Sequence, residues 1–171
     1  MADVFAGRAA ARAAARARGL FAGIAIACLA AVGAALVSQH FFDMQPCPWC
    51  VLQRVVYLAI ALACLIGLAW SSAAGRVVAG GLALLLALCG AAAALWQHYR
   101  AAASASCNLT SADRIISTLQ LDRALPSVFE PRASCADAAV SLLGVPYDFW
   151  SLVLFVLIAI TAIRVLRSHG S

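Results

Sequence analysis

Four long apolar runs, separated by polar connections, limit what this chain can fold into. They cover residues 20–37, 51–70, 77–96 and 149–165. Each run is long enough for a helix that crosses a bilayer core of about 30 Å. The composition agrees, since 65% of the residues are hydrophobic and only 11% are charged, unlike a soluble domain. The sequence therefore predicts an all-α membrane protein, a bundle of four transmembrane helices spanning residues 20–166.

The polar segments complete the predicted organisation. A basic tail (1–19) precedes the first span, a short tail (167–171) follows the last, and loops 38–50 and 97–148 lie together on the opposite side. The long loop carries Ser111 and Asp113, residue types that cap helices. The apolar residues Ile115, Ile116 and Leu119 follow them. We expect a short amphipathic helix here that lies on the membrane surface.

The arginines predict the orientation. The two tails, the 71–76 turn and the end of the last apolar run carry seven arginines against one acidic residue, Asp3, whereas the other side carries four arginines against six acids. By the positive-inside rule both termini are cytoplasmic and the two loops face outward. For a bacterial inner membrane, that side is the periplasm, where disulfides form and persist. The net charge of +5 comes from scattered arginines, so we expect no nucleic-acid partner.

The seven cysteines fall into two groups. Those inside apolar runs are expected to pack as small hydrophobic residues; they are Cys28, Cys64 and Cys89. The other four lie in or beside polar segments: Cys47, Cys50, Cys107 and Cys135. Cys47-Pro48-Trp49-Cys50 is a Cys-x-x-Cys dithiol of the kind that undergoes redox exchange. Because Pro48 suits the first turn of a helix, Cys47 should lie at a helix N-terminus, which favours its thiolate.

Arg54 is the only charged residue in the second apolar run and lies four residues after Cys50. Residues at this spacing share a helix face, and a charge at membrane depth indicates a functional role. Arg54 could stabilise a thiolate, bind a carbonyl acceptor, or do both. The alternative is an arginine that reaches lipid headgroups.

Cys107 and Cys135 enclose a segment of the long loop and leave two interpretations open. A bridge between them would stabilise the fold by roughly 3.5 kcal/mol in the chain-entropy model. A sulfur in a flexible outward loop is instead suited to meeting another protein. A third reading, a metal site built from the four outward cysteines, is possible for zinc. It is weakened because only one pair has ligand spacing and Arg54 would oppose a cation.

Taken together, these features resemble the disulfide bond formation protein B (DsbB) family of quinone-linked oxidants of periplasmic thiol oxidases. The resemblance covers nearly the whole chain after the basic tail. It consists of four spans, a Cys-x-x-Cys that opens the second, an arginine four positions later, and a cysteine pair in the loop before the fourth. Gln53 stands where an acidic residue often precedes that arginine.

The resemblance implies a role for each site residue. Cys107 is attacked by the reduced partner, Cys135 is its internal partner, and Cys47 and Cys50 receive the electrons by exchange between the loops. Cys50 then passes them to a quinone, ubiquinone or menaquinone, whose ring carbonyl contacts Arg54. His98 and Trp49 are implied to lie near this quinone.

The implied function is a thiol:quinone oxidoreductase without a metal, which reoxidises a periplasmic thioredoxin-fold oxidase (DsbA-like). A membrane quinone and the lipid bilayer are the other expected partners. The alternatives are a membrane disulfide reductase that runs the reverse flow, and the cysteine-ligated metal module described above.

Overall fold

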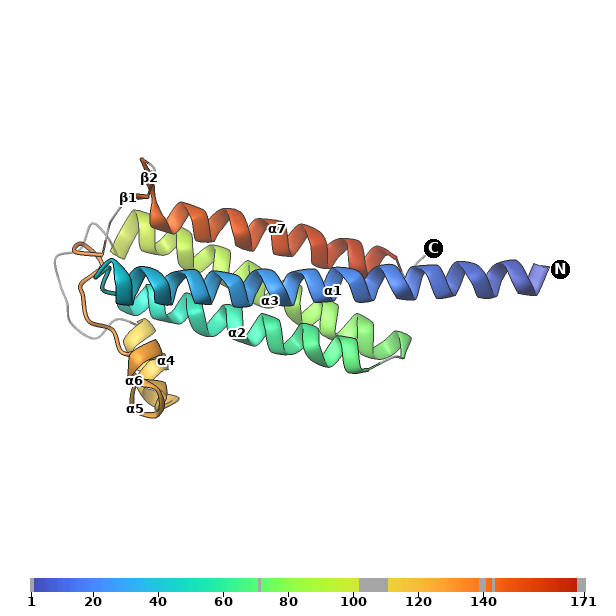
Figure 1. The fold of residues 1–171 in the computed structure, drawn as a ribbon, viewed down its shortest axis with the longest axis horizontal. Coiled ribbons are helices and arrows are strands. Elements are labelled where there is room, and N and C mark those ends of the chain that lie inside the picture. The colour runs from blue at the N-terminus through green and yellow to red at the C-terminus, as the bar shows by residue number, and fades with distance from the viewer. Residues whose placement is uncertain (1, 71, 102–110, 139–140, 143, 169–171) are drawn as a thin grey trace.

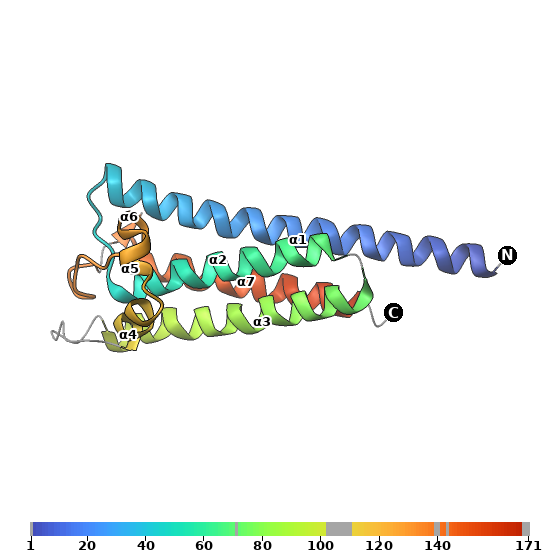
Figure 2. The same cartoon turned by 90° about the horizontal axis from the view of Figure 1, so that it is seen from below.

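Four long helices form the molecule. The computed structural model describes residues 2–70, 72–101, 111–138, 141–142 and 144–168. The long helices are α1 (Ala2–Phe41), α2 (Pro48–Ala69), α3 (Ala73–Trp96) and α7 (Tyr147–Arg167). They lie side by side in both views (Figures 1 and 2). Each contains a stretch long and apolar enough to cross a membrane, which confirms the predicted four-span, all-α class.

Helix α1 is longer than a bilayer requires. Its 40 residues correspond to about 60 Å of helix, roughly twice the thickness of a hydrocarbon core. It therefore extends past the other three helices at the end where α7 finishes (Figure 1). The predicted basic tail and the first span form one continuous helix, and the side chains of Arg8, Arg12 and Arg16 are exposed on its N-terminal part.

The start of α2 is fixed by its cap. Cys47 is the N-cap residue and its sulfur accepts a hydrogen bond from the Cys50 backbone N–H at 3.2 Å. Pro48 occupies the first helical position, where the missing N–H has no cost. The helix consequently begins at Pro48, three residues before the start of the predicted span.

Small residues on one face of α3 bring it close to α7. The buried members of this face are Ala79, Gly80, Ala83, Ala87, Gly90 and Ala94. A Cβ atom at Gly90 would collide with the ring of Phe155 on α7. That ring stacks on Tyr57 of α2, with centroids 4.3 Å apart and planes inclined by 6°. Gly90 thus allows a close contact between helices of the kind that small residues permit in membranes.

Helices α2 and α3 are joined at the end where α7 finishes, whereas the α1–α2 connection and the long segment between α3 and α7 lie at the opposite end (Figures 1 and 2). Helix α3 continues into a π-helical turn, η1 (Gln97–Ala101). The short helices are α4 (Ser111–Thr118), α5 (Leu121–Ala124) and α6 (Pro126–Phe129). A short antiparallel hairpin precedes α7; its strands, β1 (Ser141–Leu142) and β2 (Val145–Pro146), have two residues each.

Helix α4 lies where the sequence predicts a short amphipathic helix, but its apolar residues are divided between two environments. Ile116 is buried against Val51 of α2 and Phe129 of α6. Ile115 and Leu119 are exposed. The helix is therefore attached to the bundle through Ile116 and leaves other apolar side chains at its surface.

Candidate redox site

Cys47 and Cys50 form the centre of the site at the first turn of α2. Their sulfurs are 2.7 Å apart, and Cys47 is completely buried. The hydrogen bond from the Cys50 N–H to the Cys47 sulfur holds that sulfur at the helix end. The pair is therefore arranged for exchange between dithiol and disulfide without rearrangement of the helix.

Cys135 lies against Cys47. The two residues form one small buried cluster, with Trp49, Cys50 and Ala138 packed around it. Backbone hydrogen bonds bring the segment there, since the N–H groups of Arg132 and Ala133 both donate to the Pro46 carbonyl oxygen, at 2.9 and 3.3 Å. The fold thus places three of the four predicted redox cysteines together. Cys107 lies outside the described residues.

The hydrogen bonds between the sulfurs distinguish Cys47 from Cys135. The pKa of Cys47 is raised because its thiol hydrogen-bonds first to Cys135 and then to Cys50, and because it is buried. The pKa of Cys135 is lowered, mainly by the hydrogen bond from Cys47, against the opposing effect of burial. The Trp49 backbone N–H contributes to this lowering. Cys135 is therefore the sulfur that ionises more readily, and Cys47 is the sulfur that donates a hydrogen bond to it.

Arg54 and Gln39 anchor the loop to the bundle. Arg54 is only 5% exposed. Its Nη1 atom donates to Gln39 Oε1 at 2.7 Å and to the Val128 carbonyl oxygen at 2.9 Å. Gln39 in turn donates to the Ser127 carbonyl oxygen at 3.3 Å. The arginine predicted to act on a ligand therefore also holds α1 and the segment that leads to Cys135.

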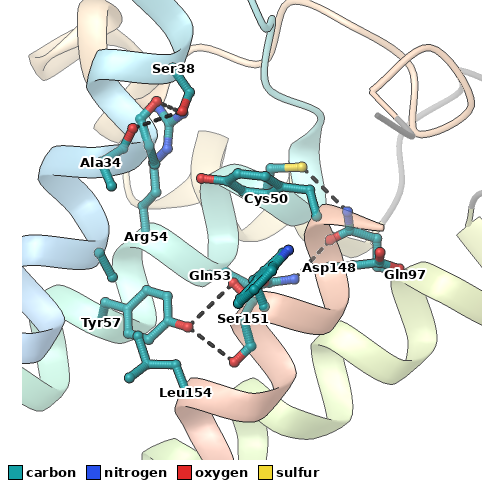
Figure 3. Close-up of a pocket in the computed structure, with 14 residues that line it drawn as sticks. Ala34, Ser38, Cys50, Gln53, Arg54, Tyr57, Gln97, Asp148, Ser151 and Leu154 are labelled. Atoms are coloured by element: carbon teal, nitrogen blue, oxygen red, sulfur yellow. Dashed lines mark hydrogen bonds between the residues drawn. The ribbon is translucent and has the colours of Figure 1, made fainter. Parts of the chain in front are cut away.

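A cavity of about 250 Å³ opens beneath Cys50. It is lined by Ala31, Ala34, Ala35, Ser38, Cys50, Gln53, Arg54, Tyr57, Gln97, Tyr147, Asp148, Trp150, Ser151 and Leu154. Figure 3 shows how these side chains surround the space. Tyr57 donates its hydroxyl to the Ser151 carbonyl oxygen at 3.2 Å. Trp150 is 45% exposed and Ala34 is also exposed, so the cavity reaches the bundle surface between α1 and α7.

The structure separates the four residues expected near a bound quinone. Cys50 and Arg54 line the cavity, whereas Trp49 and His98 are not among its lining residues. The Trp49 ring packs beside Trp96, with centroids 6.5 Å apart. His98 Nδ1 lies 2.8 Å from Asp148 Oδ2, so His98 reaches the cavity only through Asp148.

Several polar residues of the site were not singled out by the sequence analysis. They are Gln39, Gln97, Tyr147 and Asp148, which stand at the ends of apolar runs. Gln39 and Gln97 are 3% and 7% exposed. The signal in the sequence was the position of these two amides directly beside long apolar runs. An amide that is buried there must find a hydrogen-bond partner. The contacts themselves depend on the tertiary arrangement.

The remaining cysteines have separate surroundings. Cys28 and Cys64 are buried in the main apolar core, as small hydrophobic residues pack. Cys89 is exposed on α3. Among the described residues, no group of three or more His, Cys, Asp and Glu side chains is arranged to hold a metal ion.

Comparison with known proteins gives a consistent result. A family model described as "Disulfide bond formation protein DsbB" matches residues 17–165. The chain is 34% identical to disulfide bond formation protein B of Herminiimonas arsenicoxydans, over 82% of this chain and 89% of that protein. It is 33% identical to the protein of the same name from Aromatoleum aromaticum, over 90% and 95%. It is 37% identical to disulfide bond formation protein B 1 of Pseudomonas fluorescens, over 80% and 82%.

Proposed function

The chain belongs to the disulfide bond formation protein B (DsbB) family, and from that premise we propose that it is a thiol:quinone oxidoreductase. As a family member it is a multi-pass protein of the bacterial inner membrane and a protein-disulfide oxidoreductase. The proposal adds the two substrates. One is the dithiol of a periplasmic thioredoxin-fold oxidase (DsbA-like), and the other is a membrane quinone.

The proposed orientation puts both termini in the cytoplasm and the cysteines at the periplasmic surface. It is supported by the position of α1's first residues and α7's last residues at one end of the bundle, with the loops at the other (Figure 1). The arginines of α1 and α7 lie at the first end, as the positive-inside rule requires of a cytoplasmic side.

Two disulfide exchanges would carry electrons from the partner to the membrane. In the first, the partner's thiolate attacks Cys107 in a Cys107–Cys135 disulfide, and the partner leaves oxidised with Cys107 and Cys135 as thiols. In the second, the Cys135 thiolate attacks Cys47 of the Cys47–Cys50 disulfide, and Cys50 leaves as a thiolate. Cys107 then closes the loop disulfide again by attacking Cys135, which releases Cys47 as a thiol. Two electrons and two protons have then moved from the partner to Cys47 and Cys50.

The last step needs an acceptor at Cys50, and the cavity suits one. Its volume of about 250 Å³ and its exposed lining residues on α1 and α7 fit an apolar ring with a lipid tail, and its polar groups are few, as in many ligand sites. Bonds to Gln39, Val128 and Ala35 occupy three of Arg54's five N–H groups. Within the described part of the chain, the other two have no hydrogen-bonded acceptor, so one could donate to a ring carbonyl oxygen.

A quinone bound there would supply a two-electron, two-proton acceptor that diffuses in the bilayer. The residues of this chain would hold its ring between α1 and α7 and keep Cys50 at one edge. His98 and Asp148 form an ion pair or hydrogen bond at the outer rim. Trp49, which packs outside the cavity, would contribute to the cysteine cluster through its backbone N–H rather than to the ring.

One observation carries the proposal: the two sulfurs of one pair face different sites. Cys47 contacts Cys135 of the loop, whereas Cys50 lines the cavity. Such a dithiol can accept electrons from the loop cysteine through Cys47 and deliver them to an acceptor in the cavity through Cys50.

The test is an assay with pure protein, a reduced thioredoxin-fold oxidase and a short-chain ubiquinone or menaquinone. We expect quinone absorbance to fall in step with loss of partner thiols, one quinone for two thiols. Oxidation of reduced quinone with release of partner thiols would instead support the reductase. Absence of turnover in both directions would contradict both readings.

A further inference from the structure

The amide of Gln97 points at the sulfur of Cys50. Gln97 is the C-cap residue of α3, and its Nε2 atom lies 3.4 Å from Cys50 Sγ. The side chain is 7% exposed. Figure 3 shows this contact at the upper edge of the cavity, where the sulfur and the amide face each other. The amide therefore donates an N–H···S hydrogen bond at a position with little access to water.

Gln53 fixes which end of that amide meets the sulfur. The Gln53 Nε2 atom lies 2.8 Å from Gln97 Oε1, and Gln53 is 4% exposed. An amide group can donate only through its nitrogen and accept only through its oxygen. Because Gln53 donates to the Gln97 oxygen, the Gln97 NH2 group is directed toward Cys50. The same interaction gives each of the two buried amides a hydrogen-bond partner, without which its burial would be costly.

The backbone at the end of α3 makes this geometry possible. Gln97 begins the π-helical turn Gln97–Ala101, a wider turn that occurs often at functional sites. Within this turn, the side chains of two consecutive residues lie in different surroundings. Gln97 lines the cavity, whereas the next residue, His98, bonds to Asp148.

We propose that Gln97 is a catalytic residue that stabilises the Cys50 thiolate, and that Gln53 is a positioning residue that orients the Gln97 amide. When the Cys135 thiolate attacks Cys47, the Cys47–Cys50 bond breaks and its electron pair remains on the Cys50 sulfur. The Gln97 N–H then donates to a charged acceptor, a stronger bond than one to a neutral sulfur. This role rests on the proposed function for its place in turnover, whereas the hydrogen bond does not.

The amide of Gln97 and the guanidinium group of Arg54 have different hydrogen-bond partners in the site. Arg54 lines the same cavity, but it donates hydrogen bonds to Gln39, Val128 and Ala35. Gln97 contacts the sulfur directly and leaves the guanidinium group for α1 and the loop. The two residues therefore act on different atoms of the site.

The test measures Cys50 alone, without partner or quinone. In a protein with Cys47→Ser, Cys107→Ser and Cys135→Ser, Cys50 can form no disulfide with the other redox cysteines. Its alkylation rate by iodoacetamide at neutral pH, followed by peptide mass spectrometry, reports its thiolate. We expect Gln97→Leu to lower this rate about threefold or more, because the thiolate loses a charge-assisted hydrogen bond and the thiolate fraction falls. The decrease in rate is smaller than the decrease in thiolate fraction, because a less stabilised thiolate is also a stronger nucleophile.

Two substitutions of matched shape test the polarity of the network. Gln97→Glu replaces the donor with a carboxylate and should lower the rate at least as much. Gln53→Glu leaves a group that can only accept, so the Gln97 amide should turn its NH2 group toward position 53 and its oxygen toward Cys50. That variant should also lose rate, although residue 53 does not touch the sulfur. Gln120→Leu, at an exposed glutamine of the loop, is the control and should keep the parental rate.

Parental rates in both Gln97→Leu and Gln97→Glu would overturn the role of Gln97. A reduced rate in those variants with a parental rate in Gln53→Glu would overturn the positioning role of Gln53. Thermal unfolding in detergent identifies any variant that is misfolded, and the nearly isosteric Glu substitutions then carry the test. A protein that fails to reduce quinone but shows these rates would refute the proposed function and leave the Gln97 hydrogen bond intact.

Discussion

Cys135 contacts Cys47, its neighbour in a buried cluster, rather than lying free in the loop. The contact exists because the backbone N–H groups of Arg132 and Ala133 donate hydrogen bonds to the carbonyl oxygen of Pro46. Pro46 is the residue immediately before Cys47. The loop is therefore attached to the bundle beside the cysteine that it is proposed to attack.

This contact predicts a specific cross-link. In a protein with Cys50→Ser and Cys107→Ser, mild oxidation should join Cys47 to Cys135 in nearly all molecules, because the two sulfurs already touch. Peptide mapping under non-reducing conditions measures the yield. Cys89→Ser, at an exposed position on α3, should leave that yield unchanged. A product in which Cys135 instead joins a second molecule would contradict the observed contact.

The pKa of Cys135 predicts a pH dependence. A lowered pKa gives Cys135 more thiolate than an ordinary thiol at any pH below about 8.5. Alkylation of reduced Cys50→Ser, Cys107→Ser protein should therefore reach half its maximal rate at Cys135 below about pH 8.5. The neighbouring Cys47, whose pKa is raised, should react slowly over the same range.

Cys47→Ala in that background removes the hydrogen bond that lowers the Cys135 pKa. The midpoint for Cys135 should then move upward. A midpoint that stays in place would mean that Cys47 does not donate to the Cys135 sulfur in solution.

Arg54 should affect both ends of the site. Arg54→Lys keeps a charge but loses the fork that binds Gln39, Val128 and Ala35 together. We expect the KM for quinone to rise roughly tenfold or more, as for the loss of a charged hydrogen bond. The yield of the Cys47–Cys135 cross-link should also fall, because the loop loses its anchor at Val128.

Arg114→Lys, at an exposed position on α4, is the matched control for the arginine-to-lysine change. It should keep the parental KM and the parental cross-link. If Arg54→Lys changed the KM alone, the loop would not depend on Arg54 in solution.

A methyl group at Gly90 should disturb the cavity from below. The Phe155 ring fills the space that a Cβ would occupy and stacks on Tyr57, which lines the cavity. Gly90→Ala should therefore reduce stability by about 1–3 kcal/mol, the usual cost of overpacking, and weaken quinone binding. Thermal unfolding in detergent and quinone titration measure the two effects.

Gly81→Ala provides the comparison on the same helix. A Cβ at Gly81 has no other atom within 4 Å, so this variant should unfold and bind quinone as the parent does. Equal behaviour of the two variants would show that the close contact between α3 and α7 is not needed for either property.

The sequence was sufficient for the four long helices and for α4, but not for the smaller elements of the loop or for the contacts between elements. Hydropathy located all four spans, because an apolar run must be a helix to satisfy its backbone in lipid. The cysteine spacing located the Cys-x-x-Cys pair beside the second span. The apolar run begins only at Val51, but Pro48 indicated the earlier start of the helix, and Cys47 is its N-cap residue as predicted.

The pairing of Cys135 with Cys47 could not be read from spacing. It depends on hydrogen bonds between Pro46 and a distant loop segment, which no periodicity encodes. The same holds for Gln97, whose approach to Cys50 depends on how the end of α3 packs beside the first turn of α2. For Trp49 the resemblance implied a place near the quinone, and the structure adds that its ring lies beside Trp96, with centroids 6.5 Å apart.

The hydrogen bond from the Cys50 backbone to the Cys47 sulfur has a consequence for the speed of the relay. A sulfur held in place by the helix end, with one cysteine on either side, can change partners without a large movement of α2. Little reorganisation is then needed at this step, and the barrier to internal exchange should be low. The slow step of turnover is consequently expected elsewhere, in the docking of the partner or in the exchange of quinone with the bilayer.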